Sequence, residues 1–263
     1  MNKKLKSYLK LLLQLLKTDF IILKKNIFNS IINIFISISL LLFVFAYIYP
    51  QLGMTKFFGP LFVVSAMVSF CIFEIWATTA DFISDLEGNK TISYPLTLPI
   101  PSWLYFVKLA IYYACKTMIS TAIIIPLGKL LLLNRMDLSH FSPIKFLIIF
   151  VNINIFAGFL SLFISGVTKN ISNIRRVWTR FLFPLWFLGC ADFPWKIAYK
   201  FSPKFSYILL INPITSAMEG IRTAVLGQSR FINFWLCFLI LSIFTFIFGF
   251  LGIKKLKKRL DFV

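Results

Sequence analysis

The chain alternates long apolar segments with short basic ones. Three segments, Ile27–Tyr49, Phe146–Thr168 and Phe231–Ile253, each run for 23 residues without a charged side chain. A helix that crosses a membrane needs about 20 predominantly apolar residues, so each of the three predicts a span. Two further spans are predicted at 61–82 and 103–133, although lysines at 108, 116 and 129 interrupt the second.

A weaker segment at 177–191 predicts the fifth of six spans. It offers only eleven uncharged residues, from Phe181 to Ala191. Both ends of the chain are basic, and basic segments favour the cytoplasmic side, so the number of spans should be even. Six spans place 17 of the Lys and Arg residues in inner segments and 8 in outer ones. We therefore expect an all-α integral membrane protein with both termini cytoplasmic.

The first 25 residues carry a second pattern. Lys3, Lys10, Lys17 and Lys24 recur every seven residues and share one helical stripe, with leucines on the opposite side. This pattern predicts an amphipathic helix over 3–25 that lies on the cytoplasmic membrane surface. A simple basic anchor for the first span is the alternative.

The longest connection, 192–228, contains Pro194, Pro203 and Pro213. Irregular backbone at membrane depth must be sheltered by protein or water. We therefore expect short re-entrant helices in the outer leaflet, between the fifth and sixth spans. No linker or repeat divides the sequence, so residues 1–263 form one membrane domain.

Composition supports this class. Apolar residues make up 59% of the chain, charged residues only 14%, and the mean hydropathy is +0.85, which excludes an ordinary soluble domain. The net charge of +19 resides in basic segments that flank the spans, so it indicates anionic lipids rather than nucleic acid. The host membrane is expected to be a bacterial plasma (inner) membrane.

The sequence contains no convincing catalytic constellation. His140 is the only histidine, and the four cysteines all fall in apolar stretches, where they are expected to be small buried hydrophobes. Residues 88–91 are too short and misspaced for a phosphate-binding loop. We expect no metal, no cofactor, and no ATP hydrolysis by this chain itself.

Two ionisable residues, Glu74 and Lys116, fall inside predicted spans. Because these spans are consecutive and antiparallel, the two charges could meet. Ionisable residues within a membrane are functional candidates, but a structural ion pair between helices is at least as good an interpretation.

The connection at 84–102 is predicted to be a cytoplasmic coupling loop. It combines acidic residues with apolar ones that a mere loop does not need. This mixture favours a short element docked on a partner protein. Its candidate contact residues are Asp85, Leu86, Glu87, Thr91, Ile92 and Pro99.

Residues 212–222 combine a helix start with an acid–base pair. Asn212 can cap a helix, and Pro213 suits its first position. Glu219 and Arg222 are three residues apart and can pair on one face. We expect this pair to hold an outer gate, and swapping the two residues to recover much of a single mutant's loss. A capped surface helix with a solvated pair is the alternative.

The spacing Asn212-Pro213-x-Thr215-x-x-x-Glu219-x-x-Arg222 resembles the motif that type-2 ABC exporter permeases carry before their last span. Thr91-Ile92 with Pro99 eight residues after the threonine, downstream of acidic residues, is similar to a second motif of that family. Lys90 replaces the usual glycine of this motif, and Pro95 interrupts it.

This resemblance implies a permease subunit that pairs as a homodimer with separate ATP-binding subunits. The short outer loops are similar to the branch that exports lipid-linked glycans. The alternatives are a drug or lipid exporter of the same family, an ion-coupled carrier that uses Glu74 and Lys116, and a membrane-embedded lipid-modifying enzyme.

Overall fold

The computed structural model describes residues 3–53, 55, 57–92 and 101–260. These residues form helices and connections, with no strand among them. Five helical stretches of the described chain are long and apolar enough to cross a membrane. The first stretch, Phe28–Gln51, is the second half of a longer helix that begins with α1. The other four are α3 (Phe58–Glu87), α4 with α5 (Ser102–Leu132), α6 (Pro143–Val167) and α12 (Phe234–Leu260). The all-helical class expected from the sequence is confirmed for the described residues, and the five apolar helices are compatible with a multi-pass membrane protein.

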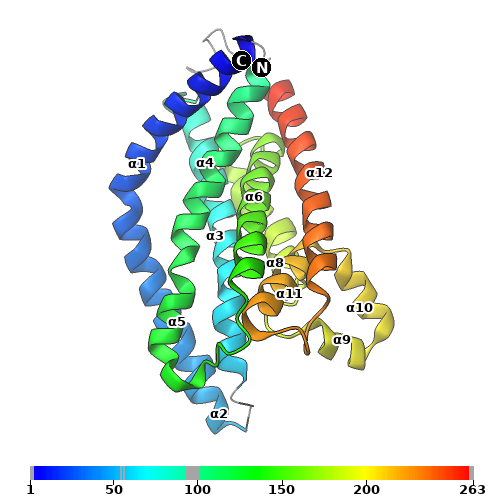
Figure 1. Ribbon diagram of the computed structural model, residues 1–263. Coiled ribbons are helices and arrows are strands. Elements are labelled where there is room, and N and C mark those ends of the chain that lie inside the picture. Colours follow the sequence, from blue (N-terminus) through cyan, green and yellow to red (C-terminus); the bar gives the residue numbers. More distant parts are fainter. Residues whose placement is uncertain (1–2, 54, 56, 93–100, 261–263) are drawn as a thin grey trace.

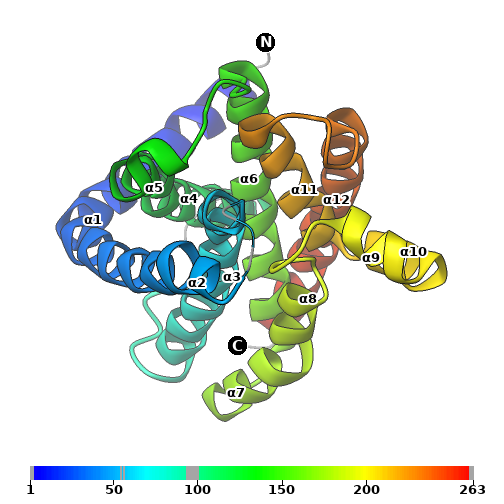
Figure 2. The same ribbon diagram turned by 90° about the horizontal axis from the view of Figure 1, so that it is seen from below.

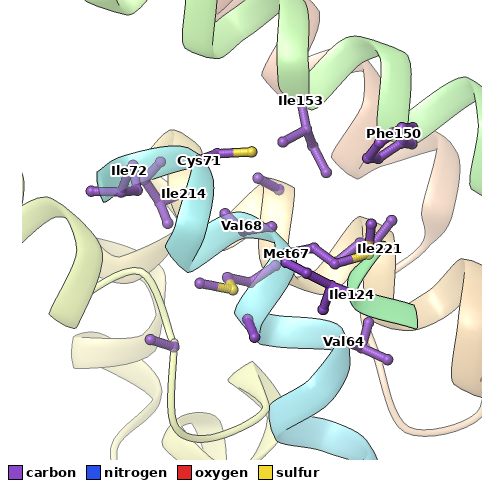
Figure 3. Close-up of a cluster of buried hydrophobic side chains, with 14 of the residues drawn as sticks. Val64, Met67, Val68, Cys71, Ile72, Ile124, Phe150, Ile153, Ile214 and Ile221 are labelled. Atoms are coloured by element: carbon purple, nitrogen blue, oxygen red, sulfur yellow. The ribbon is translucent and has the colours of Figure 1, made fainter. Parts of the chain in front are cut away.

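The helices α3 and α6 form the centre of the bundle, with α1 and α12 on opposite sides (Figures 1 and 2). Figure 3 shows buried side chains of α3, α5, α6 and α11 (Pro213–Leu226) meeting; between helices in a membrane such contacts stabilise by close van der Waals packing. The α3 residues face Ile124 of α5, Phe150 and Ile153 of α6, and residues of α11. This packing holds α11 inside the bundle.

The first helix is longer than the sequence pattern indicated. α1 runs unbroken from Lys3 to Leu42 and continues through a π-helical turn, Phe43–Ile48, into α2 (Tyr49–Gln51). Residues 3–25 are therefore not a separate helix. Leu16 and Leu23 are buried, while Lys17 and Lys24 are exposed, because this part of α1 packs against α4. Contact of its lysines with the membrane surface stays a prediction.

Prolines explain the two irregular places in these long helices. Pro50 has no N–H for the carbonyl of Ala46, four residues earlier, and that carbonyl accepts from Arg135 Nη1 at 2.8 Å instead. Pro126 likewise has no N–H for the carbonyl of Ala122, and the helix is interrupted there into α4 (Ser102–Ala122) and α5 (Ile124–Leu132).

The fifth predicted span, 177–191, is not one of the long helices. The chain there forms α7 (Ile174–Val177), a π-helical turn (Trp178–Leu182) and α8 (Phe183–Phe187). At about 1.5 Å per residue, these helical residues cover about 21 Å, less than the hydrocarbon core of about 30 Å. Pro184 accounts for the irregular turn, since it cannot bond to the carbonyl four residues before it.

The connection at 192–228 forms three short helices. They are α9 (Trp195–Phe201), α10 (Pro203–Leu210) and α11, which ends at Gly227 with φ +91°. α9 and α10 project from the side of the bundle beside α12 (Figures 1 and 2). The two termini lie at the same end of the molecule (Figure 1).

Candidate functional site

Helix α11 begins where the sequence predicted. Asn212 Oδ1 accepts from the N–H of Ile214 at 2.9 Å, and Pro213 is the first helical residue. The amide of Asn212 also donates to the carbonyl of Leu185 at 2.6 Å, and Thr215 donates to that of Leu209 at 2.7 Å. The cap thus joins α11 both to the chain just before it and to α8.

The remainder of α11 is buried, including its charges. Residues 213–225 are all buried, and the side chains of Glu219 and Arg222 are fully enclosed. Arg222 Nη1 lies 3.2 Å from Glu219 Oε1. The predicted pair is therefore present, and the alternative of a surface helix with a solvated pair is wrong.

Arg222 has a partner for each of its N–H groups. Nε and Nη2 donate to the Ser65 hydroxyl of α3 at 3.0 and 2.7 Å. Nη2 also donates to the carbonyls of Cys190 and Ala191, and Nη1 to that of Phe193. A buried guanidinium needs such complete pairing, because an unpaired buried charge is costly.

Glu219 completes this network on the other side. Its Oε1 accepts from the N–H of Trp195 at 3.0 Å, and its Oε2 from the N–H of Ile232 at 3.1 Å. The Arg222 network (Ser65, Glu219, Arg222 and their main-chain partners) therefore joins α3, the chain leaving α8, the start of α9 and the approach to α12. Its geometry suits a fixed structural centre rather than a surface that binds a ligand.

Glu74 and Lys116 also meet, at 3.2 Å between Oε2 and Nζ. α3 extends to Glu87, so Glu74 lies 13 residues from its end, about 20 Å at 1.5 Å per residue. Lys116 lies 14 residues from the start of α4, about 21 Å by the same rise. Because the depths match in antiparallel helices, the two side chains can pair.

We call α7, the π-helical turn and α8 together the 174–187 helix. A cavity of about 610 Å³ lies beside the Glu74–Lys116 ion pair, between α1, α3 and the 174–187 helix. We call it the aromatic cavity. Phe73 and Trp178 line it with ring centroids 5.6 Å apart, and Trp76 and Trp178 with centroids 5.9 Å apart. Polar side chains share the walls: Ser30, Asn33, Ser37, Glu74 and Arg175.

A second cavity, of about 400 Å³, lies between α1, α3 and α4. We call it the charged groove. Its residues Asp19 and Lys108 form an ion pair between α1 and α4, and Asp81 lies 3.9 Å from Lys116. These two acids were not predicted as site residues. The lysines inside a predicted span were the available signal, because a charge at that depth requires a partner.

The predicted coupling loop begins later than expected. Residues 84–87 form the last turn of α3. Asp85, expected as a contact to a partner, instead holds its own turn, since it accepts from the hydroxyl of Thr91 and from the N–H of Ile92 at 2.9 Å. Glu87 Oε1 accepts from the N–H of Ile171 at 3.0 Å, before α7. We call residues 85–92 the coupling turn; Pro99 lies outside the described residues.

The apolar residues of this turn are not free for a partner. Leu86 and Ile92 are half-buried and pack against a cluster that contains Phe82, Tyr105 and Leu256. Burial of apolar surface against the chain's own core explains why a connection carries them. The expectation that they are exposed on a docked element is corrected by this packing.

Comparisons with known proteins add no assignment: no family model, no curated protein and no solved structure matched the chain.

Proposed function

We propose that this chain is the membrane-spanning permease subunit of an ATP-driven exporter, in which a separate subunit hydrolyses ATP. The observation that carries the proposal is the aromatic cavity beside the 174–187 helix, which is too short to cross a membrane. Transporters commonly place binding sites where a helix is discontinuous. Here the short helix brings Arg175 and Trp178 to a cavity that also contains Glu74.

Six crossings are the topology that we favour. The 174–187 helix enters from the end where α6 finishes, and the three helices α9, α10 and α11 occupy the remaining depth before α12 returns. The two termini lie at one end (Figure 1), as an even number of crossings requires. The excess of Lys and Arg at that end supports a cytoplasmic position in a bacterial plasma membrane.

The coupling turn provides a route from that end to the cavity. Glu87 accepts a hydrogen bond from the N–H of Ile171. Ile171 lies four residues before Arg175 in the chain. A partner subunit that displaced the end of α3 would therefore displace the start of the 174–187 helix. Arg175 and Trp178 would move with it and change the shape of the aromatic cavity.

A dimer fits the exposed apolar surface next to the cavity. Phe28, Phe35 and Phe43 of the first helix are exposed, as are Phe183 and Phe187 of α8. The α8 rings adjoin the cavity, because Phe183 and the cavity residue Trp178 have ring centroids 6.3 Å apart. A second copy placed against these α8 rings would cover the cavity, whereas lipid covers them in the single chain. We propose a homodimer on this basis.

The cavity walls suit an amphiphile with a polar head. Flat aromatic faces provide apolar contact area, while Glu74, Asn33 and Arg175 provide groups for hydroxyls and phosphates. A lipid-linked glycan combines these features, and a drug or lipid substrate of the same exporter class would use the aromatic faces more than the polar groups.

The test is purification of the tagged chain from its own host's membranes in a mild detergent. We expect a subunit with a phosphate-binding loop to copurify in equal amount, with ATP hydrolysis that the isolated chain lacks. The variant Asp85→Asn should weaken copurification, because the turn would lose its charged anchor, while Asp137→Asn at the other end should not. A chain that purifies without any ATP-binding subunit would contradict the proposal.

An ion-coupled carrier is the second candidate, and the Glu74–Lys116 pair beside the aromatic cavity favours it. Ionisable pairs at membrane depth serve as coupling sites in carriers. Such a protein would respond to an ion gradient in liposomes without nucleotide. Glu74→Gln would then abolish the response, whereas an ATP-driven permease would show none to abolish.

A further inference from the structure

The charged groove is built from facing helical stripes. Thr78, Asp81 and Asp85 of α3 recur at spacings of three and four, so they share a face. Tyr105, Lys108, Tyr112 and Lys116 do the same on α4, and Asp19 of α1 closes the side. This arrangement places opposite charges along the whole groove.

Acid predominates in the groove although the chain is strongly basic. The chain has only 9 acidic residues against 28 basic ones. Three of the acids line the groove, and Glu74 joins them through Lys116. Lys108 is matched by Asp19, and Lys116 lies closer to Glu74 than to Asp81. Four carboxylates therefore face two ammonium groups.

Among the described residues, Asp81 is the carboxylate of the groove with the fewest partners, because the one cation near it, Lys116, lies closer to Glu74. Asp85 is held by Thr91 and Ile92, whereas Asp81 has only Lys116 at 3.9 Å within the described part of the chain. Its side chain is 78% exposed, so the groove opens to the surroundings at this carboxylate. A ligand that approaches here meets a negative charge first.

Thr78 offers an independent sign of a missing partner. Its side chain lies in the groove wall, the residue is only 3% exposed, and its hydroxyl has no hydrogen-bond partner in the described structure. Every other buried threonine of the described chain donates to a main-chain carbonyl. Buried hydroxyls are normally paired, so the Thr78 hydroxyl is available to a group that enters the groove.

The depth of the groove fits the membrane interface. Asp81 lies six residues before the end of α3, about 9 Å at 1.5 Å per residue. α3 has 30 residues and is about 45 Å long, against a hydrocarbon core of about 30 Å. Asp81 thus lies close to the boundary between the hydrocarbon and the headgroups.

We propose that the charged groove binds a primary ammonium group. Asp81 is its counter-ion, the Thr78 hydroxyl accepts one N–H, and the Tyr112 ring provides a face for the cation. A primary ammonium has three N–H donors, which matches a carboxylate and a hydroxyl better than a quaternary one. The source is either the headgroup of an ethanolamine phospholipid or a soluble amine. This inference does not depend on the transport activity.

The experiment is native mass spectrometry of the purified chain in detergent. Equal amounts of phosphatidylethanolamine and phosphatidylglycerol are supplied, and soluble ethanolamine is added in a separate arm. A hydrogen bond to a charged group corresponds to about tenfold in affinity, so we expect about a tenfold preference for the ethanolamine lipid. Asp81→Asn should remove the preference, and the near-isosteric Thr78→Val should reduce it severalfold.

The lipid arm and the soluble ethanolamine arm together show where the bound ammonium group comes from. Ethanolamine that binds and shows the same dependence on Asp81, without a lipid preference, would assign the groove to a soluble amine. Asp137→Asn removes an exposed carboxylate at the opposite end and should change neither arm. Binding of neither ligand, or a preference that persists in Asp81→Asn, would overturn the proposal. Tryptophan-fluorescence melting confirms that each variant is folded.

Discussion

Arg222 and Ser65 lie 157 positions apart in the chain, yet the guanidinium donates two hydrogen bonds to the Ser65 hydroxyl, at 3.0 and 2.7 Å. The contact joins the buried helix α11 to the central helix α3. It also fixes the carbonyls of Cys190 and Ala191, where the chain leaves α8. These contacts therefore fix the C-terminal end of the 174–187 helix, beside the aromatic cavity, to the core.

Loss of this network should be severe. Arg222→Ala leaves Glu219 buried without its partner, which costs about 3–5 kcal/mol in other proteins. Ser65→Ala removes one acceptor and should cost about 1–3 kcal/mol. Thermal unfolding in detergent, followed by tryptophan fluorescence, measures both. Ser39→Ala is the matched control, because that hydroxyl bonds only to a carbonyl of its own helix.

The exchange of Glu219 and Arg222 should not recover stability. From their spacing alone, a swapped pair would be expected to work. In the structure, however, Glu219 accepts from two main-chain N–H groups and Arg222 donates to three carbonyls. After the exchange, the carboxylate would face main-chain carbonyl oxygens, which are also acceptors, and the guanidinium would face main-chain N–H groups, which are also donors. A double variant as stable as the wild type would contradict this.

Local chemistry could be predicted from the sequence, and distant partners could not. Asn212 and Pro213 mark a helix start by their own side chains, and the start is where they place it. Ser65 carries no signal that Arg222 will reach it. The same limit applies to Asp19: its pairing with Lys108 depends on how α1 packs against α4.

The length of an apolar run did not predict the length of the helix where a proline interrupts the run. The run from Phe181 to Ala191 is apolar, but Pro184 and the preceding arginines leave a short, irregular helix instead of a long one. The heptad of lysines at the N-terminus predicts an amphipathic helix whether or not it is separate from the next. The structure shows that it continues, because α1 is one unbroken helix from Lys3 to Leu42.

Pro50 and Arg135 should behave as a coupled pair. Arg135 donates to the Ala46 carbonyl that Pro50 cannot serve, and its guanidinium stacks 4.4 Å from the centroid of Tyr47. Arg135→Ala should cost about 1–3 kcal/mol, because it leaves that carbonyl unpaired. Pro50→Ala restores a helical N–H, so the second substitution should cost less in the double variant. Strictly additive melting shifts would show that the two residues act independently.

Gly158 allows α6 to approach α4 closely. A Cβ atom at this position would lie 2.3 Å from the carbonyl oxygen of Ala110, which is main chain and cannot move aside. Gly158→Ala should therefore destabilise the protein by about 1–3 kcal/mol, as overpacking does. Gly249→Ala meets only the ring of Phe159, at 3.1 Å, and should cost less. Equal melting temperatures for the two variants would contradict this packing.

The orientation can be measured with single cysteines in a cysteine-free background. Gln51, Ser139 and Lys200 are exposed, as are Lys90 and Lys257 near the end that holds both termini. We expect a membrane-impermeant maleimide to label the first three positions from outside sealed cells. Labelling of positions 90 or 257 from outside would reverse the topology.

The most direct test of an ATP-driven permease is whether nucleotide changes access to the aromatic cavity. Ala77 lines this cavity, so the variant Ala77→Cys is modified with a charged maleimide in the complex with the copurified ATP-binding subunit. Coupling between two sites amounts to about fivefold or more, and we predict at least about a fivefold change in rate with ATP and vanadate. Ser139→Cys, in the exposed connection before α6, should keep its rate. Equal rates for Ala77→Cys with and without nucleotide, in a complex that hydrolyses ATP, would contradict the proposed function.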